Sequence, residues 1–291
     1  MTSITASMVK ELRERTGLGM MDCKKALSEA SGDMEKAIED LRKASGLKAA
    51  KKASRVAAEG VVMAKVSGDG NRGVILEVNS ETDFVARDEN FLRFAGEALE
   101  IAYNENEASV EVLLSKGLEE SRQALVQKIG ENISVRRIER LNFENANQGI
   151  VESYVHNNAK IGVLISLKGG DEALARDIAM HIAAVNPLVV RPEDVPEDVL
   201  AKESEIYAAQ ARESGKPDEI VEKMISGRLR KFVSEVSLLE QQFVKDPENT
   251  IRNLLEEVGA DIVQFVRYEV GEGIEKEEED FAAEVAAQLN S

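Results

Sequence analysis

One cysteine, two histidines and many carboxylates are the side chains that could carry covalent or acid–base chemistry. Cys23 lies between Asp22 and Lys24 near the expected start of a helix, a position that favours a reactive thiolate. Structural packing is the favoured interpretation of this cysteine. His181 lies on the apolar side of an expected helix, which indicates a core residue, whereas His156 lies in a polar turn, which indicates exposure. No pair of carboxylates stands out by its spacing, so an enzyme mechanism has no residue set to rest on.

Residues 68–73 spell the glycine pattern GxGxxG. In dinucleotide-binding proteins this pattern joins a strand to a helix. Here it joins two expected strands, so we interpret it as a hairpin turn. A single cysteine excludes an internal disulfide framework and a multi-thiolate metal site, and two histidines leave little for zinc. We therefore expect no cofactor and no metal site.

The sequence EVNSETDFVAR at residues 77–87 contains the apolar pair Phe84 and Val85. It connects an expected strand to an expected helix, and it is roughly six residues longer than the corresponding connection later in the chain. An apolar pair on a lengthened loop is costly unless something covers it. Two interpretations remain open: Phe84 lies under its own domain, or it fills a pocket of a partner protein.

Composition limits the classes of function. The chain has 291 residues, of which 43% are hydrophobic and 31% charged, and its net charge is −17. This indicates a soluble protein of roughly two domains and argues against a nucleic-acid partner, since phosphate binding needs a cationic face. No apolar run approaches the roughly 20 residues that span a bilayer. We expect a cytoplasmic protein without membrane contact.

Hydrophobic periodicity predicts an α+β fold. Three short helices are expected within residues 5–44, with Met20 and Met21 in a break between the first two. Two strands then form an antiparallel hairpin, and a helix with Phe91 and Phe94 on its apolar side follows. The expected elements after the bundle are strands 60–66, 73–78 and 133–138 and a second helix at 117–128.

The same pattern then occurs again. Strands are expected at residues 149–155 and 162–167, and a helix follows through Leu174, Ile178 and Ile182. The closing strand, 263–268, resembles residues 133–138. The two hairpins are offset by 89 residues and the closing strands by 130. This pattern predicts a duplicated ββαβ unit whose second copy carries an inserted segment.

The inserted segment, residues 191–231, is expected to form two helices, near 197–213 and 218–234. The Gly and Pro of Ser214-Gly-Lys-Pro217 lie where a helix end and a helix start place them. A projecting helical pair would offer a surface to another chain, whereas a pair folded back on its own core would not. The pattern alone does not decide between these two. A further helix is expected at 281–289.

Two long stretches of the sequence closely resemble bacterial elongation factor Ts. They are LRERTGLGMMDCKKAL at residues 12–27 and EVNSETDFVAR at residues 77–87. Further similarity at 161–164, 214–217 and 265–275 extends the resemblance over essentially the whole chain.

The resemblance implies an architecture and a partner. The partner is elongation factor Tu, the GTPase that carries aminoacyl-tRNA, and the activity is exchange of its GDP for GTP without enzymatic chemistry. The implied parts are a three-helix domain similar to a ubiquitin-associated domain with a linker (1–55), a first core subdomain (56–148), a second core subdomain (149–190 and 232–272), a helical-hairpin dimerisation insert (191–231) and a C-terminal helical module (273–291). A homodimer through residues 191–231 is expected on the same ground.

The resemblance also implies contact residues. The loop Thr82, Asp83, Phe84 and Val85 is expected to enter the nucleotide domain of the GTPase and to disturb its magnesium site. The other implied contacts are Arg13, Met20, Met21, Lys24, His156 and Val236. Two alternatives remain: a non-catalytic adaptor or scaffold built on the N-terminal bundle, which leaves the loop unexplained, and an unrecognised hydrolase that uses carboxylates.

Overall fold

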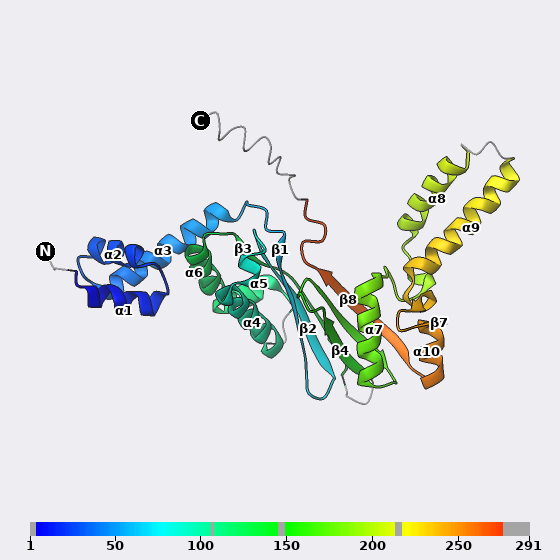
Figure 1. Ribbon diagram of the computed structural model, residues 1–291, viewed down its shortest axis with the longest axis horizontal. Helices are drawn as coiled ribbons and strands as arrows, with labels where there is room; N and C mark the ends of the chain where they lie inside the picture. Colours follow the sequence, from blue (N-terminus) through cyan, green and yellow to red (C-terminus); the bar gives the residue numbers. More distant parts are fainter. Residues whose placement is uncertain (1–3, 106–107, 145–148, 213–216, 276–291) are drawn as a thin grey trace.

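The computed structural model describes residues 4–105, 108–144, 149–212 and 217–275. The molecule is elongated, with a group of helices at its N-terminal end, two sheets in the middle and a helical hairpin at the other end (Figure 1). Within the described ranges, none of the helices combines the length and apolar character needed to cross a bilayer. The helix expected at 281–289 and most of the 214–217 motif lie outside the described residues.

The N-terminal helices are α1 (Ala6–Thr16), α2 (Met20–Glu29) and α3 (Met34–Lys52). Leu12, Cys23 and Leu27 are fully buried between them. The expected three helices are confirmed, but α3 continues well beyond residue 44. The expected break around Met20 and Met21 is wrong, because α2 already begins at Met20.

Two antiparallel sheets of three strands form the centre of the fold. The first has the order β1 (Glu59–Val66), β2 (Arg72–Ser80), β3 (Ile133–Asn142), and the second β4 (Ile150–Val155), β5 (Ile161–Lys168), β8 (Asp261–Glu269). All six strands were expected. The resulting fold is α+β, with helices at the N-terminus and small antiparallel sheets.

Helices cover the outer faces of both sheets. The first sheet packs against α4 (Glu89–Asn104), α5 (Val110–Leu113) and α6 (Glu119–Ile129), and the second against α7 (Glu172–Val185) and α10 (Ile251–Val258). Alternate side chains of β2 divide between two cores: Leu76 faces the helices, whereas Ile75 faces the second sheet. Strand β2 is therefore buried on both faces, as its nearly continuous apolar sequence indicates.

The seam between the sheets consists of matched contacts. The Val62 amide donates to the Ala159 carbonyl at 2.7 Å, and the Val151 amide donates to the Gly70 carbonyl at 2.6 Å. Val151 lies 89 positions after Val62, and Ala159 lies 89 positions after Gly70. Two glycines permit this close approach, since a Cβ at Gly73 would lie 2.7 Å from Leu164 and one at Gly162 would lie 2.5 Å from Val62.

Each sheet has a bulge in its closing strand. Glu77 pairs with Arg137 and Val78 with Val135, so Arg136 is the extra residue. Ser166 pairs with Gln264 and Leu167 with Ile262, so Val263 is extra. Gln264 therefore takes the place of Arg137, an offset of 127 rather than the expected 130. The sequence match aligned similar side chains, whereas the hydrogen bonds on either side of the bulge set the register.

The inserted segment and the five residues after it form α8 (Glu197–Arg212) and α9 (Asp218–Val236), which project away from the sheets (Figure 1). Ala211 and Val221 are buried in this hairpin. No element was expected between the hairpin and the closing strand. The structure has a 3₁₀ turn (Leu238–Glu240), two short strands, β6 (Gln242–Phe243) and β7 (Asp246–Thr250), and α10 there.

Candidate partner-binding site

The connection from β2 to α4 is longer than its counterpart in the second sheet. Asp88 caps α4 and Asp171 caps α7, each accepting backbone N–H bonds in the first turn. Glu77 and Ser166 occupy matching positions at the bulges. Eleven positions separate Glu77 from Asp88 and five separate Ser166 from Asp171, so the first connection has the six additional residues that were expected.

The additional residues of this connection are held by buried side chains, and they expose one aromatic ring. Val85 and Ala86 are buried in the same core cluster as Phe91. Phe84 is 80% exposed. The apolar pair therefore divides: Val85 belongs to the core of its own domain, and Phe84 points into solvent. The interpretation in which Phe84 lies under its own domain is wrong.

Hydrogen bonds order the loop around Phe84. The Thr82 amide and hydroxyl both donate to the Glu131 carboxylate, at 3.0 and 2.7 Å. The Thr82 hydroxyl also accepts from the Val85 amide at 3.4 Å. Asp83 pairs with Arg87 at 2.9 Å on the outer side of the turn. The loop is thus a turn ordered by hydrogen bonds, and it exposes the side chain of Phe84.

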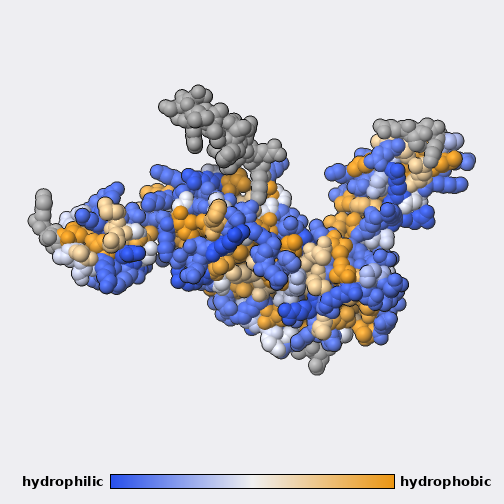
Figure 2. All heavy atoms as spheres, in the orientation of Figure 1, coloured by the Kyte–Doolittle hydropathy of each residue, from blue (hydrophilic) through white to orange (hydrophobic). Residues whose placement is uncertain are grey.

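A second set of expected contact residues lies on the N-terminal helices. Met20 and Met21 are 59% and 76% exposed, and Arg13 and Lys24 are exposed as well. Apolar surface is visible on these helices in Figure 2. The turn between α1 and α2 lies close to α4, because Thr16 and Gly17 share a cleft of about 250 Å³ with Asn90 and Lys128.

His156 and Val236 lie in other parts of the molecule. His156 is exposed in the turn between β4 and β5, and its Nδ1 is 3.0 Å from the Tyr154 hydroxyl. Val236 ends α9 and is half-buried, and its carbonyl accepts from the Leu188 amide. The N-terminal helices and the α8–α9 hairpin occupy opposite ends of the long axis (Figure 1), so the expected contacts are spread over several surfaces.

Cys23 and His181, two of the side chains that could carry covalent or acid–base chemistry, are buried. Cys23 is fully buried in the N-terminal core. His181 is fully buried, contacts Gln241 Oε1 at 2.9 Å and accepts from the Val244 amide. Burial lowers the pKa of His181, although the Gln241 contact opposes this effect, so the ring is neutral at pH 7. The described residues contain no group of three or more His, Cys, Asp and Glu side chains able to hold a metal ion.

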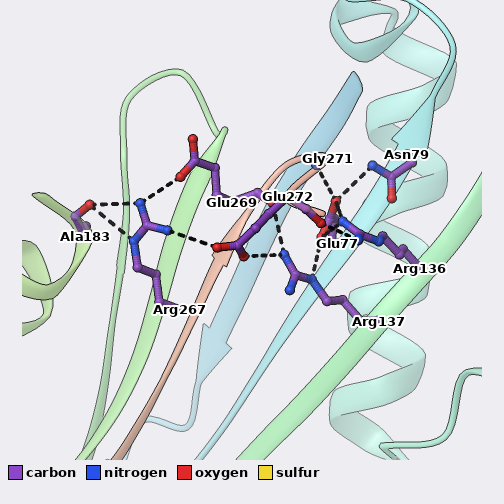
Figure 3. A network of polar contacts seen from close by, with 9 residues as sticks. All are labelled: Glu77, Asn79, Arg136, Arg137, Ala183, Arg267, Glu269, Gly271 and Glu272. Atoms are coloured by element: carbon purple, nitrogen blue, oxygen red, sulfur yellow. Dashed lines mark hydrogen bonds and ion pairs between the residues drawn. The ribbon is translucent and has the colours of Figure 1, made fainter. Parts of the chain in front are cut away.

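A buried carboxylate in β2 was not predicted from the sequence. Glu77 is fully buried and accepts from the Gly271 amide at 2.8 Å and from Asn79 at 2.9 Å. Arg136 and Arg137 contact it at 3.1 and 2.6 Å (Figure 3). Burial alone would raise the pKa of Glu77, but the Gly271 amide, Asn79 and Arg137 outweigh it and lower the pKa. A glutamate amid the apolar residues of β2 was the available signal.

Comparisons with known proteins agree with the resemblance in the sequence. Residues 81–272 match the protein family described as Elongation factor TS. The chain is similar to "Elongation factor Ts" of Hahella chejuensis, with 64% identity over 99% of both chains. It is also 60% identical to "Elongation factor Ts" of Teredinibacter turnerae, over 99% of this chain and 97% of that protein. The protein of the same name from Francisella tularensis subsp. novicida is 55% identical over 99% of both chains.

Proposed function

Because the chain belongs to the elongation factor Ts family, we infer that it is the guanine nucleotide exchange factor of elongation factor Tu. It binds the GTPase in its GDP form and promotes replacement of GDP by GTP during translation elongation in the bacterial cytoplasm. It is a binding protein that lowers a barrier, not an enzyme. The observation that carries the site assignment is the exposed Phe84 ring on a loop that is otherwise anchored.

Exchange requires contacts that strengthen as the nucleotide loosens. A ligand with nanomolar affinity is held by about 12 kcal/mol. Acceleration of its release by some four orders of magnitude requires a barrier lower by roughly 5.5 kcal/mol. The factor supplies this only through differential binding, and linkage makes the coupling reciprocal: nucleotide also expels the factor.

We propose that Phe84 makes the contact that strengthens most. Full burial of a phenylalanine side chain contributes about 1.5–3 kcal/mol. When the Thr82–Val85 loop enters the nucleotide domain, it displaces a segment that holds magnesium, and the metal's pairing with the phosphates is lost. Val85 is already buried in the core of this protein, so its role is to hold the loop rather than to enter the pocket.

Measurement of GDP release tests the function directly. Purified elongation factor Tu loaded with a fluorescent GDP should release it much faster when this protein is added in substoichiometric amounts. An adaptor or scaffold would bind without acceleration. A hydrolase would show turnover without the GTPase. An unchanged release rate would contradict the proposed function.

We propose that Met20 and Met21 supply affinity rather than the exchange step. Both are exposed on α2, and flexible methionines suit an adaptable apolar contact. Replacement of both by alanine should raise the half-saturating concentration roughly tenfold and leave the maximal release rate unchanged. Leu47→Ala, also at an exposed apolar residue of the N-terminal helices, is the control and should change neither value. A lower maximal rate with the same half-saturating concentration would contradict this assignment.

We propose that the hairpin formed by α8 and α9 mediates self-association and is dispensable for exchange. It projects away from the sheets, far from the N-terminal helices (Figure 1). Replacement of residues 203–226 by a short Gly-Ser linker keeps Leu200 and Leu229 at the hairpin base. Sedimentation should then give the mass of a monomer, with exchange retained. A folded variant without exchange would contradict the separation of roles, and an unchanged mass would contradict the dimer.

We also propose the finer architecture. The three N-terminal helices are the module similar to a ubiquitin-associated domain, and the two sheets with their helices are copies of one ββαβ unit. The matched seam contacts and the matching bulges support the duplication. The hairpin is the part added to the second copy. The remaining proposed contacts with the GTPase lie on surfaces other than the loop: Arg13, Lys24, His156 and Val236.

A further inference from the structure

Residues 130–132 connect α6 to β3 and hold the loop that carries Phe84. Gly130 ends α6 in the left-handed conformation, with φ 89°. The Glu131 carboxylate then accepts both hydrogen bonds from Thr82, one at each oxygen. Because the Thr82 hydroxyl also accepts from the Val85 amide, Glu131 fixes the turn on both sides of Phe84. Hydrogen bonds to an ionised acceptor are the stronger kind.

Two of these three residues, Gly130 and Asn132, also hold the end of α3 and the residues just after it. The Lys52 ammonium donates to the Gly130 carbonyl. The buried Asn132 side chain donates to the carbonyls of Arg55 and Ala53, at 2.8 and 3.4 Å. Residues 130–132 therefore touch the segment that follows the N-terminal helices as well as the loop.

A further link joins the two segments through Glu81. The backbone N–H of Asn132 donates to Glu81 Oε1 at 2.6 Å. Glu81 Oε2 also lies 3.5 Å from Arg55. The loop, the α3 end and the start of β3 thus form one connected set of polar contacts.

We propose that Glu131 is the positioning residue for Phe84, and that residues 130–132 fix the loop relative to the N-terminal helices. The inference rests on the proposed function, in which Phe84 enters a pocket of the GTPase. Without Glu131, the loop would sample many orientations. Only the fraction of molecules whose loop is oriented for entry could place Phe84 in the pocket, so the rate of exchange would fall with that fraction. A preformed loop avoids the entropy of ordering at the moment of entry.

The test is GDP release from elongation factor Tu over a range of concentrations of the Glu131→Ala variant. We expect the maximal rate to fall roughly tenfold, because two hydrogen bonds to a charged group are removed. The half-saturating concentration should change little, since the N-terminal surface is intact. Glu111→Ala, at an exposed glutamate of α5, is the control and should match the parent. Glu131→Gln keeps the shape and one acceptor oxygen, so an intermediate rate is expected.

A double variant separates positioning from a direct contact. Since Glu131 acts through Phe84, Glu131→Ala should cause no further loss in the Phe84→Ala background. In the free Glu131→Ala variant, amides 82–87 should exchange hydrogen faster while β3 stays protected. Parent-like rates for Glu131→Ala, full additivity with Phe84→Ala, or unchanged amide exchange would each overturn the proposal. If the parent protein itself failed to accelerate release, the proposed function would fail instead.

Discussion

Phe84→Ala is expected to lower the maximal rate of GDP release about thirtyfold. The Phe84 ring is 80% exposed in the free protein, so it can become buried when it enters a pocket of the partner. Deletion of a well-packed phenylalanine costs about 3–5 kcal/mol. If only about 2 kcal/mol of that is expressed at the transition state, release slows about thirtyfold. Binding to the nucleotide-free GTPase should weaken less than the rate falls.

Stability measurements make the Phe84 result specific. An exposed side chain contributes little to folding, so the melting temperature of Phe84→Ala should stay close to the parent value. Val258→Ala, at another exposed apolar residue, is the matched control and should leave exchange unchanged. Parent-like release by Phe84→Ala would assign the disturbance of the magnesium site to another residue.

Glu77→Ala is expected to lower the free energy of unfolding by about 3–5 kcal/mol. The carboxylate is fully buried, and its removal leaves Arg136 and Arg137 without their shared partner. It also frees the Gly271 amide and so loosens the segment after β8. Urea denaturation of the variant and the parent measures the difference. Glu100→Ala breaks the exposed pair with Lys65 and should cost less than about 1 kcal/mol.

The Glu77 effect should depend on pH in one direction. Burial raises the pKa of Glu77, but hydrogen bonds from Gly271, Asn79 and Arg137 and the charge of Arg137 lower it by more, so the net shift is downward. Its stabilising contribution is therefore complete above the ordinary glutamate value of about 4.3 and is lost as pH falls through the lower folded value. The difference between parent and variant should shrink in acid. A constant difference down to pH 3 or an increase in acid would contradict a charged Glu77.

Elements with strong periodicity were predictable from the sequence. The helix through Phe91 and Phe94 buries the expected face, and both hairpins have the expected strands. The region around α10 was not predictable, because an eight-residue helix and two short strands leave too few repeats for a period to emerge. The bulges change the pairing register of the closing strands, and similarity of side chains between the two strands does not reveal this change.

The exposed loop of the candidate site was predictable in its place along the chain, whereas its construction was not. The additional residues of the first connection and the family motif both indicated Phe84. Whether that ring was covered depended on Val85 and Ala86, which enter the core and turn Phe84 outward. Glu131 gave no sequence signal, because its role depends on the approach of a segment 49 residues away in the chain.

The seam between the two sheets has a consequence for the ancestry of the fold. Val62 contacts Ala159 as Val151 contacts Gly70, and Gly73 approaches Val151 as Gly162 approaches Val62. Such exchanged contacts are the mark of an isologous interface, in which one surface patch meets a copy of itself across a twofold axis. A shorter ancestor with a single unit would thus have paired with itself, and gene fusion would have joined the two subunits. In the duplication that we propose, each copy would have been free to diverge after the fusion, one by lengthening the connection after β2 and the other by acquiring α8 and α9.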